Sequence, residues 1–186
     1  MKLSLSAILF VPVVSAGYYG YKPKCYGKLE KVVIDFETDG SGNPLSLGAV
    51  PTSLPEGITV KASRHPRSPV PPTGMDQAIF DTANPTGGDS DLATDDEGLV
   101  LIINESYDPW FPDDNRHGGE ITFSFADPVF AVNSLTLLDI EKPKSNRPDN
   151  TVSGTGVGGA PLGESVIPPS ANGGKTTVNT PGLFNT

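Results

Sequence analysis

The chain has 186 residues with 13 basic and 22 acidic side chains, and its formal net charge of −9 argues against nucleic acid or an anionic membrane surface as an electrostatic partner. Glycine (21) and proline (19) together exceed a fifth of the chain, which argues against a helical bundle. The single cysteine excludes an internal disulfide framework.

Residues 1–16 are typical of a secretory signal peptide. A basic start is followed by an apolar run from Leu3 to Val14 and by a small-residue cleavage site that ends at Ala16. The run is shorter than the roughly 20 residues that span a bilayer, and Pro12 interrupts it, so an anchor helix is the weaker interpretation. We therefore predict a protein that is secreted, extracellular or at the cell surface, with no transmembrane segment.

Residues 17–30 form a short arm that is rich in tyrosine and lysine and contains Cys25. In an oxidising compartment a lone cysteine indicates an intermolecular or mixed disulfide. A flexible tether with an incidental thiol explains the same arm equally well.

Residues 31–186 are predicted to form one all-β domain, an antiparallel β-sandwich. The expected strands are short apolar or alternating segments separated by Gly, Pro, Asn and Asp clusters. In chain order they are 31–36, 58–62, 99–103, 120–125, 129–132, 135–140 and, more weakly, 175–178. No segment has apolar residues at helical spacing over ten or more positions, so we expect little helix.

Two further features follow from this pattern. Strand alternation places Ile121, Phe123 and Phe125 on one face, and the segment 119–140 is the clearest predicted hairpin. The segments 63–75 and 142–174 are predicted to be loops because they are rich in Pro, Gly, Ser and Asn.

The sequence stops where a sandwich would begin another strand. A missing closing strand would leave unpaired backbone groups on its neighbour, which a longer chain or a partner molecule would have to satisfy. A frayed tail is the simpler alternative.

Four sequence segments resemble those of a known protein family. They are Ile34–Gly42, Phe80–Leu92, Gly98–Glu105 and Leu137–Glu141. The chain resembles the galactose-binding-like jelly-roll domains of secreted and surface-attached bacterial proteins and of some algal ones. The resemblance implies a sandwich that often holds a structural calcium ion and sometimes binds glycans. It implies no common activity, and such domains usually close with one more strand than this sequence provides.

Acidic residues are concentrated in one window. Half of the 22 acids lie between Asp76 and Asp114, and no lysine or arginine occurs between Arg67 and Arg116. Carboxylates brought together without cations repel each other, and Ca²⁺, which takes six to eight oxygen ligands, relieves that repulsion. The predicted Ca²⁺ ligands are Asp81, Asn84, Asp89 and Asp91. A solvated acidic face is the alternative interpretation.

A second, weaker calcium site is predicted at Glu37 and Asp39. The segment 35–40 has acids at alternate positions followed by a glycine, like the start of an EF-hand loop. Position 12 of such a loop would be Ser46 rather than glutamate, and no flanking helices are predicted, so an EF-hand is rejected.

The segment 107–117 is the best candidate for contact with a glycan. Sugar rings stack on aromatic faces, while planar polar groups bond their hydroxyls. The predicted contacts are Tyr107, Trp110, Asp113, Asp114, Asn115 and Arg116. The alternative is that Trp110 and Phe111 fold back and cap the sandwich.

No catalytic residue is predicted. The two histidines lack the spacing of a zinc protease motif, and no nucleophile elbow occurs. Asn104-Glu105-Ser106 is an N-glycosylation sequon, usable if the source glycosylates.

Together these features predict a secreted, non-enzymatic and calcium-stabilised module that attaches to a surface or to extracellular matrix, with carbohydrate as its ligand. One alternative is a structural protein that assembles through its N-terminal arm and an open strand edge. A second alternative is a secreted enzyme acting on glycans.

Overall fold

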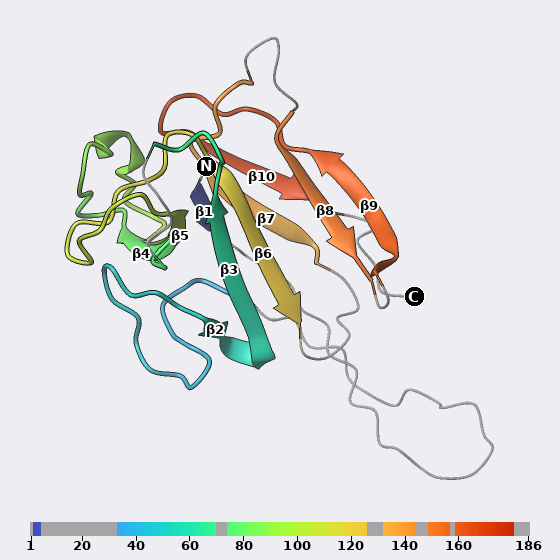
Figure 1. Cartoon of the computed structure of the whole chain (residues 1–186), viewed down its shortest axis with the longest axis horizontal. Coiled ribbons are helices and arrows are strands. Elements are labelled where there is room, and N and C mark those ends of the chain that lie inside the picture. The colour runs from blue at the N-terminus through green and yellow to red at the C-terminus, as the bar shows by residue number, and fades with distance from the viewer. Residues whose placement is uncertain are drawn as a thin grey trace.

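The computed structural model describes residues 2–4, 33–69, 74–125, 132–143, 149–156 and 159–180. Antiparallel strands dominate this part of the chain, and its helical content is two single-turn 3-10 segments, η1 (Pro55–Gly57) and η2 (Ser90–Leu92). The predicted all-β class with antiparallel sheets is confirmed (Figure 1).

The larger sheet has five strands, and every neighbouring pair is antiparallel. Its spatial order is β10 (Lys175–Asn179), β7 (Ser134–Leu138), β1 (Lys2–Ser4), β5 (Leu99–Ile103) and β4 (Gln77–Asp81). Strands distant in sequence are therefore neighbours in this sheet, which is typical of a sandwich with long crossover connections.

Two smaller sheets complete the fold. The three-stranded sheet has the order β2 (Ser53–Leu54), β3 (Ile58–Arg64) and β6 (Gly119–Phe125), and β3 pairs with β6 along its whole length. A separate hairpin consists of β8 (Thr151–Thr155) and β9 (Pro161–Val166), and Figure 1 shows it to one side of the other strands.

The main core lies between the five-stranded and the three-stranded sheet. Strand alternation sends every second side chain inward, as in β3, where buried and exposed residues alternate without interruption. The cluster contains Leu101 from β5, Leu137 from β7 and Val60 from β3, while Phe123 of β6 packs against it. This burial of apolar side chains from both sheets is what holds the two layers together.

A second apolar cluster covers the opposite face of the five-stranded sheet. Phe80, Val100, Ile102 and Leu138 point to this face, and Leu92 of η2 packs with them, each at most 1% exposed. Because β5 is buried on both faces, its continuous Leu-Val-Leu-Ile-Ile sequence is explained. The segment around η2 therefore serves as the cover of this outer face.

Gln77 connects the two sheets at the edge where β4 meets β3. Its Oε1 accepts the N–H of Ala62 at 2.6 Å, and its Nε2 donates to the carbonyl oxygens of Pro51 at 2.5 Å and Val60 at 3.0 Å. The buried side-chain amide of Gln77 thus forms hydrogen bonds with three backbone groups that have no partner on a neighbouring strand.

Several predicted strands are confirmed. The structure places strands over 58–64, 99–103, 119–125, 134–138 and 175–179, close to the expected positions. Ile121, Phe123 and Phe125 share the core-facing side of β6, as the alternation predicts. Most of the predicted strand 129–132 and the whole of the arm 17–30 lie outside the described residues.

Other predictions are wrong. The described part of 31–36 is irregular because Phe36 takes a positive φ of 62° and the Asp35 carboxylate accepts the N–H of Glu37 in a turn. The segment 119–140 is not one hairpin, since β6 pairs with β3 and β7 pairs with β1 and β10. The predicted loop 142–174 contains the β8–β9 hairpin.

Within the described residues, neither of the helical segments has the length or apolar character needed to cross a bilayer.

Candidate metal and ligand site

The candidate site is built on the connection between β5 and β6. We call residues 104–118 the site loop; it begins directly after Ile103 and ends directly before β6. A single β-bridge joins Asn104 to Asp114, so the two ends of the loop lie side by side. The N–H of Glu105 donates to the carbonyl oxygen of Asp113 at 2.7 Å and strengthens this closure.

Asn104 organises the base of the site loop. Its side-chain Nδ2 donates to the carbonyl oxygens of Met75 at 2.8 Å and Ser106 at 3.0 Å. Its Oδ1 accepts the backbone N–H groups of Ser106 and Asp113, both at 3.1 Å. The side chain is 3% exposed, so this amide uses four hydrogen bonds in a buried position to hold both ends of the loop.

The aromatic side chains of the loop point outward. Tyr107 is 59% exposed, Trp110 is 73% exposed and Phe111 is 60% exposed. A local turn fixes this segment, because the carboxylate of Asp108 accepts the N–H of Trp110 at 2.9 Å. The rings therefore do not cap the sandwich, which was the alternative to a role in ligand contact.

Gly48 supports the same segment from outside the loop. It has a positive φ of 75°, and a Cβ atom added there would lie 1.6 Å from the carbonyl oxygen of Pro109. The close approach explains why glycine is required, since any side chain would push the aromatic segment away.

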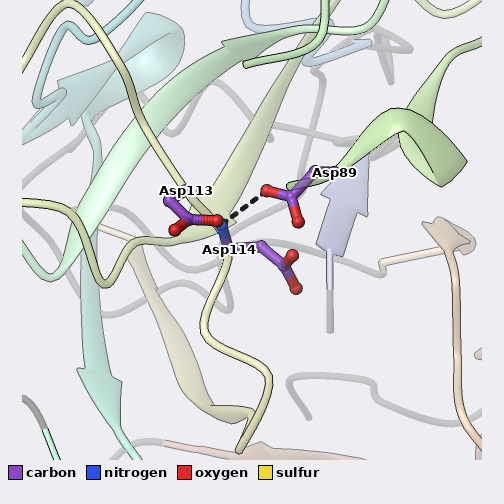
Figure 2. Close-up of side chains that lie close together, drawn as sticks. All are labelled: Asp89, Asp113 and Asp114. Atoms are coloured by element: carbon purple, nitrogen blue, oxygen red, sulfur yellow. Dashed lines mark hydrogen bonds between the residues drawn. The ribbon is translucent and has the colours of Figure 1, made fainter. Parts of the chain in front are cut away.

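Three carboxylates meet beside this loop. One oxygen from each of Asp89, Asp113 and Asp114 lies within 4.8 Å of the others, and we call these residues the acidic cluster. Figure 2 shows the three side chains together, with the N–H of Asp114 donating to Asp89 Oδ2 at 2.8 Å. Two segments that are 25 residues apart in sequence are thereby joined at one point.

Two contacts fix the 86–89 segment against the site loop. Thr86 Oγ1 donates to the carbonyl oxygen of Pro112 at 2.7 Å. Gly87 has a positive φ of 66°, and a Cβ atom on it would lie 2.7 Å from Asp113 Oδ1. The backbone of Gly87 thus leaves just enough space for the Asp113 carboxylate.

Glu105 adds a fourth carboxyl group to this region. Burial, followed by the negative charges of Asp113 and Asp114, raises the pKa of the Glu105 carboxyl above its ordinary value. Its Oε2 atom is buried and has no hydrogen-bond partner. Two negative charges thus lie close to a partly buried carboxyl, while Arg116 and His117 act in the opposite direction on its pKa.

A polar cavity of 270 Å³ opens beside the cluster. Its lining combines five carboxylates with two cationic side chains, a histidine and an asparagine. The residues with these side chains are Asp89, Asp91, Asp114, Asp139, Glu141, Arg116, Lys142, His117 and Asn150. The cavity gives the acidic cluster access to solvent and to small polar solutes.

The residues predicted as ligands of one metal ion do not all lie together in the structure. Asp89 belongs to the acidic cluster, whereas Asp81 accepts the N–H of Ala83 at 2.9 Å and the Nδ2 of Asn84 at 2.8 Å in a local turn. Asp91 lies in η2 and reaches the cavity wall. Of the four predicted ligands, the structure thus brings Asp89 into the acidic cluster, where it meets Asp113 and Asp114 of the site loop.

The predicted pair Glu37 and Asp39 makes separate local contacts. The backbone N–H of Asn43, its side-chain amide and the N–H of Ser41 hold the pKa of the Asp39 carboxyl below its usual value. Glu37 Oε1 accepts the N–H of Leu99 at 3.1 Å. Each carboxylate already has hydrogen-bond donors, which disfavours a cation site here.

The predicted ligand contacts separate into two groups. Tyr107, Trp110 and Arg116 are exposed, and Asp113 and Asp114 are partly buried in the acidic cluster. Asn115 is 0% exposed; its Nδ2 donates to the Gly118 carbonyl at 3.1 Å and its Oδ1 accepts the His117 N–H at 3.1 Å. Its place is therefore in the turn that leads into β6.

Sequence reasoning missed Glu105 and gave Asn104 a different role. A glycan on Asn104 Nδ2 would replace one of the two hydrogens that this atom donates inside the protein and would have to attach to a residue that is 3% exposed, so the geometry disfavours the predicted modification. Cys25, predicted to form an intermolecular disulfide, lies outside the described residues.

Comparisons of the chain with protein-family models, curated proteins and solved structures found no match. The chemistry of the site is therefore interpreted from its own geometry. Oxygen donors from carboxylates are the ligands that Ca²⁺ prefers, and exposed aromatic rings are the groups on which sugars stack.

Proposed function

We propose that this chain is a secreted binding module that attaches to an extracellular glycan through the site loop, with Ca²⁺ bound at the acidic cluster. The observation that carries the proposal is the exposure of Tyr107 and Trp110 on a loop that is otherwise fixed by hydrogen bonds. Exposed aromatic rings on a loop whose backbone is fixed provide a stacking surface at a reduced ordering cost.

The acidic cluster supports the calcium part of this proposal. Asp89, Asp113 and Asp114 offer several oxygen atoms within a small space, and the charges of Asp113 and Asp114 contribute, after burial, to the raised pKa of Glu105. A hard divalent cation would replace this repulsion by attraction. Since Asp113 and Asp114 lie only a few residues after Trp110, the cation would also hold the segment that presents the ring.

The predicted signal peptide supports secretion, and extracellular fluids supply calcium at concentrations that suit weak sites. The resemblance to galactose-binding-like jelly rolls supports the same architecture and ligand class. The polar cavity next to the cluster is lined in part by Arg116 and His117 of the same site loop, and such groups can bond the hydroxyls of a saccharide.

The test is binding to a panel of immobilised glycans in the presence of calcium, followed by titration calorimetry of the best ligand. We expect Trp110→Ala to weaken binding at least about fivefold, because about 1–3 kcal/mol is a typical contribution of a stacked aromatic ring. Chelation of calcium is expected to weaken binding as well.

The matched control is Val166→Ala, which removes another exposed apolar side chain (57% exposed) from the β8–β9 hairpin, outside the site loop. This variant should bind as the parent does. If no glycan binds, or if both variants bind as the parent does, the carbohydrate proposal is wrong.

A further inference from the structure

The turn before β10 contains the only Asn-Gly sequence of the chain, Asn172-Gly173. Spontaneous deamidation of asparagine is least hindered before a glycine, because glycine has no Cβ atom to keep the asparagine side chain away from the next backbone nitrogen. Asn172 is exposed, and the N–H of Gly174 donates to the carbonyl oxygen of Ala171 at 2.7 Å to close the turn around the pair. The turn therefore carries a chemical reactivity that the proposed binding function does not use.

Asp139, directly after β7, holds this turn through two hydrogen bonds. Its Oδ1 accepts the N–H of Gly173 at 3.0 Å, and its own N–H donates to the carbonyl oxygen of Gly174 at 2.8 Å. Asp139 has a positive φ of 50°, a conformation that aspartate adopts more readily than most residues. The backbone nitrogen that would attack the Asn172 side chain is thus bound to a carboxylate.

The turn is also confined by its neighbours. A Cβ atom on Gly173 would overlap the carbonyl oxygen of Asp91 in η2, so the two backbones are in close contact. The N–H of Ser170 donates to the carbonyl oxygen of Ile140 at 2.9 Å, and the N–H of Ile140 donates to Ser170 Oγ at 2.8 Å. These contacts restrict the backbone rotation that would bring the Asn172 side chain onto the nitrogen of Gly173.

We propose that Asn172 is a site of spontaneous deamidation and that the Asp139 carboxylate controls the rate of this reaction. The backbone nitrogen of Gly173 loses its proton and attacks Cγ of Asn172. A bond forms between these two atoms, the bond from Cγ to the side-chain nitrogen breaks, and that nitrogen leaves with the proton as ammonia. Water then opens the resulting succinimide at either carbonyl carbon, which gives aspartate or isoaspartate at position 172. No oxidation or reduction takes place.

The control by Asp139 follows from charge. The attacking nitrogen has to become negative, and a carboxylate oxygen at 3.0 Å opposes that charge while its hydrogen bond stabilises the protonated amide. Either product adds a carboxylate close to Asp139 and Asp91, which both line the polar cavity, and isoaspartate also lengthens the backbone of the confined turn by one carbon. The reaction therefore alters the cavity wall whether or not calcium or a glycan binds there.

The test compares the deamidation rates of the folded full chain and of three variants in a mildly alkaline buffer, well below the melting temperature. Asp139→Gly removes the carboxylate and tolerates the positive φ, whereas Asp139→Asn keeps a neutral oxygen that can accept the same N–H. The matched control, Ser170→Ala, removes the neighbouring hydrogen bond to the Ile140 N–H and leaves the contact between Asp139 and Gly173 in place. Peptide mapping by mass spectrometry measures the deamidated fraction at position 172, and a synthetic peptide of residues 168–177 gives the rate without the fold.

We expect Asp139→Gly to deamidate at least roughly tenfold faster than the parent, because a hydrogen bond to a charged group typically contributes more than about 1.4 kcal/mol, which corresponds to that factor in rate. Asp139→Asn should fall between the two, and Ser170→Ala should be as slow as the parent. An Asp139→Gly rate equal to that of the parent, or an equal acceleration by Ser170→Ala, would overturn the proposal.

Two comparisons keep the proposal testable if Asp139→Gly does not fold. The folded parent should deamidate at position 172 at least roughly tenfold more slowly than the peptide and than the parent unfolded in urea, and equal rates would show that the fold does not restrain the reaction. Asp139→Asn should still react faster than the parent, and an equal rate would contradict the role of the charge.

Discussion

Two acidic regions of this molecule contain carboxyl groups whose pKa values are shifted in opposite directions. In the turn around Asp39, three N–H donors surround one carboxylate and lower its pKa. In the region of Asp89, Asp113 and Asp114, carboxylates lie together, and burial with neighbouring negative charge raises the pKa of Glu105. In the first region the carboxylate is held by its own turn, while in the second several carboxylates from distant segments are brought together.

The difference teaches that acidic spacing in the sequence does not distinguish a carboxylate that its own turn binds from one that the fold brings to other carboxylates. The sequence made both regions candidates for calcium, because carboxylates at short spacing occur in both. Backbone geometry decides between them. The turn at 39–43 directs its N–H groups toward its own carboxylate, whereas the acidic cluster is assembled by two distant segments that each bring carboxylates.

The largest effect is expected from removing the scaffold beneath the second region. Asn104→Ala deletes four buried hydrogen bonds and leaves the backbone groups of Met75, Ser106 and Asp113 without that partner. We expect a loss of about 3 kcal/mol in the free energy of unfolding, measured with urea. A loss below about 1 kcal/mol would show that the amide does not hold the loop.

The next largest effect is expected from calcium, which should bind the acidic cluster and not the turn around Asp39. At a concentration one hundred times its dissociation constant, Ca²⁺ is expected to stabilise the parent by ~2.7 kcal/mol in thermal unfolding. Asp113→Asn should remove most of this effect because it deletes one ligand charge of the cluster, and Asp39→Asn should retain it. Equal responses of both variants would remove the distinction between the regions.

A smaller effect is expected at one glycine in each region. Gly87 and Gly42 both have positive φ, but only at Gly87 would a Cβ atom meet a cluster carboxylate, that of Asp113. Alanine at either position should cost about 1 kcal/mol through backbone strain. Gly87→Ala should in addition weaken calcium binding, and titration of both variants checks whether Gly42→Ala leaves it unchanged.

The contribution of each region to the free energy of unfolding should change with pH in opposite directions. Because the pKa of Glu105 is raised on folding, its effect on stability is favourable at low pH and is lost as the pH rises through the folded pKa. Because the pKa of Asp39 is lowered, its stabilising effect is present above the unfolded pKa and is lost as the pH falls through the folded pKa.

Consequently, Glu105→Gln without calcium should be more stable than the parent at pH 7, and Asp39→Asn should be less stable. Both differences should shrink toward zero in acid, as the wild-type carboxyl groups become protonated. Urea unfolding at pH 7 and at acidic pH measures this, and a Glu105→Gln variant that is less stable at pH 7 would contradict the upward direction of the Glu105 pKa shift.

Much of the fold could be predicted from the sequence because its central strands have strong patterns. The continuous apolar run of β5 and the strict alternation of β6 indicate their burial directly. The β8–β9 hairpin could not be predicted in this way, since its Ser, Thr and Gly residues lie in a largely exposed two-stranded sheet where propensity is weak. Pairing between strands depends on the whole fold, which explains the wrong hairpin at 119–140.

The candidate site was predicted in part. Asp89 was assigned to a metal, and Asp113 and Asp114 to a sugar, but no spacing in the sequence indicates that a segment 25 residues away meets them. The outward position of Trp110 also depends on the Asp108 turn and on the space above Gly48. These are properties of the tertiary structure. The sequence therefore indicated which residue types are present but not which of them lie together.

Gln77 has a consequence for how the molecule unfolds. Its amide belongs to a strand of the five-stranded sheet, yet all three of its bonded partners lie in β3 or in the segment just before β2. Separating the two sheets would break all three hydrogen bonds of this buried amide at once and leave its three backbone partners unpaired. Neither sheet can therefore separate from the other gradually. We therefore expect the two sheets to melt in a single cooperative transition, and amide hydrogens of β3 and β4 to exchange with the same opening free energy.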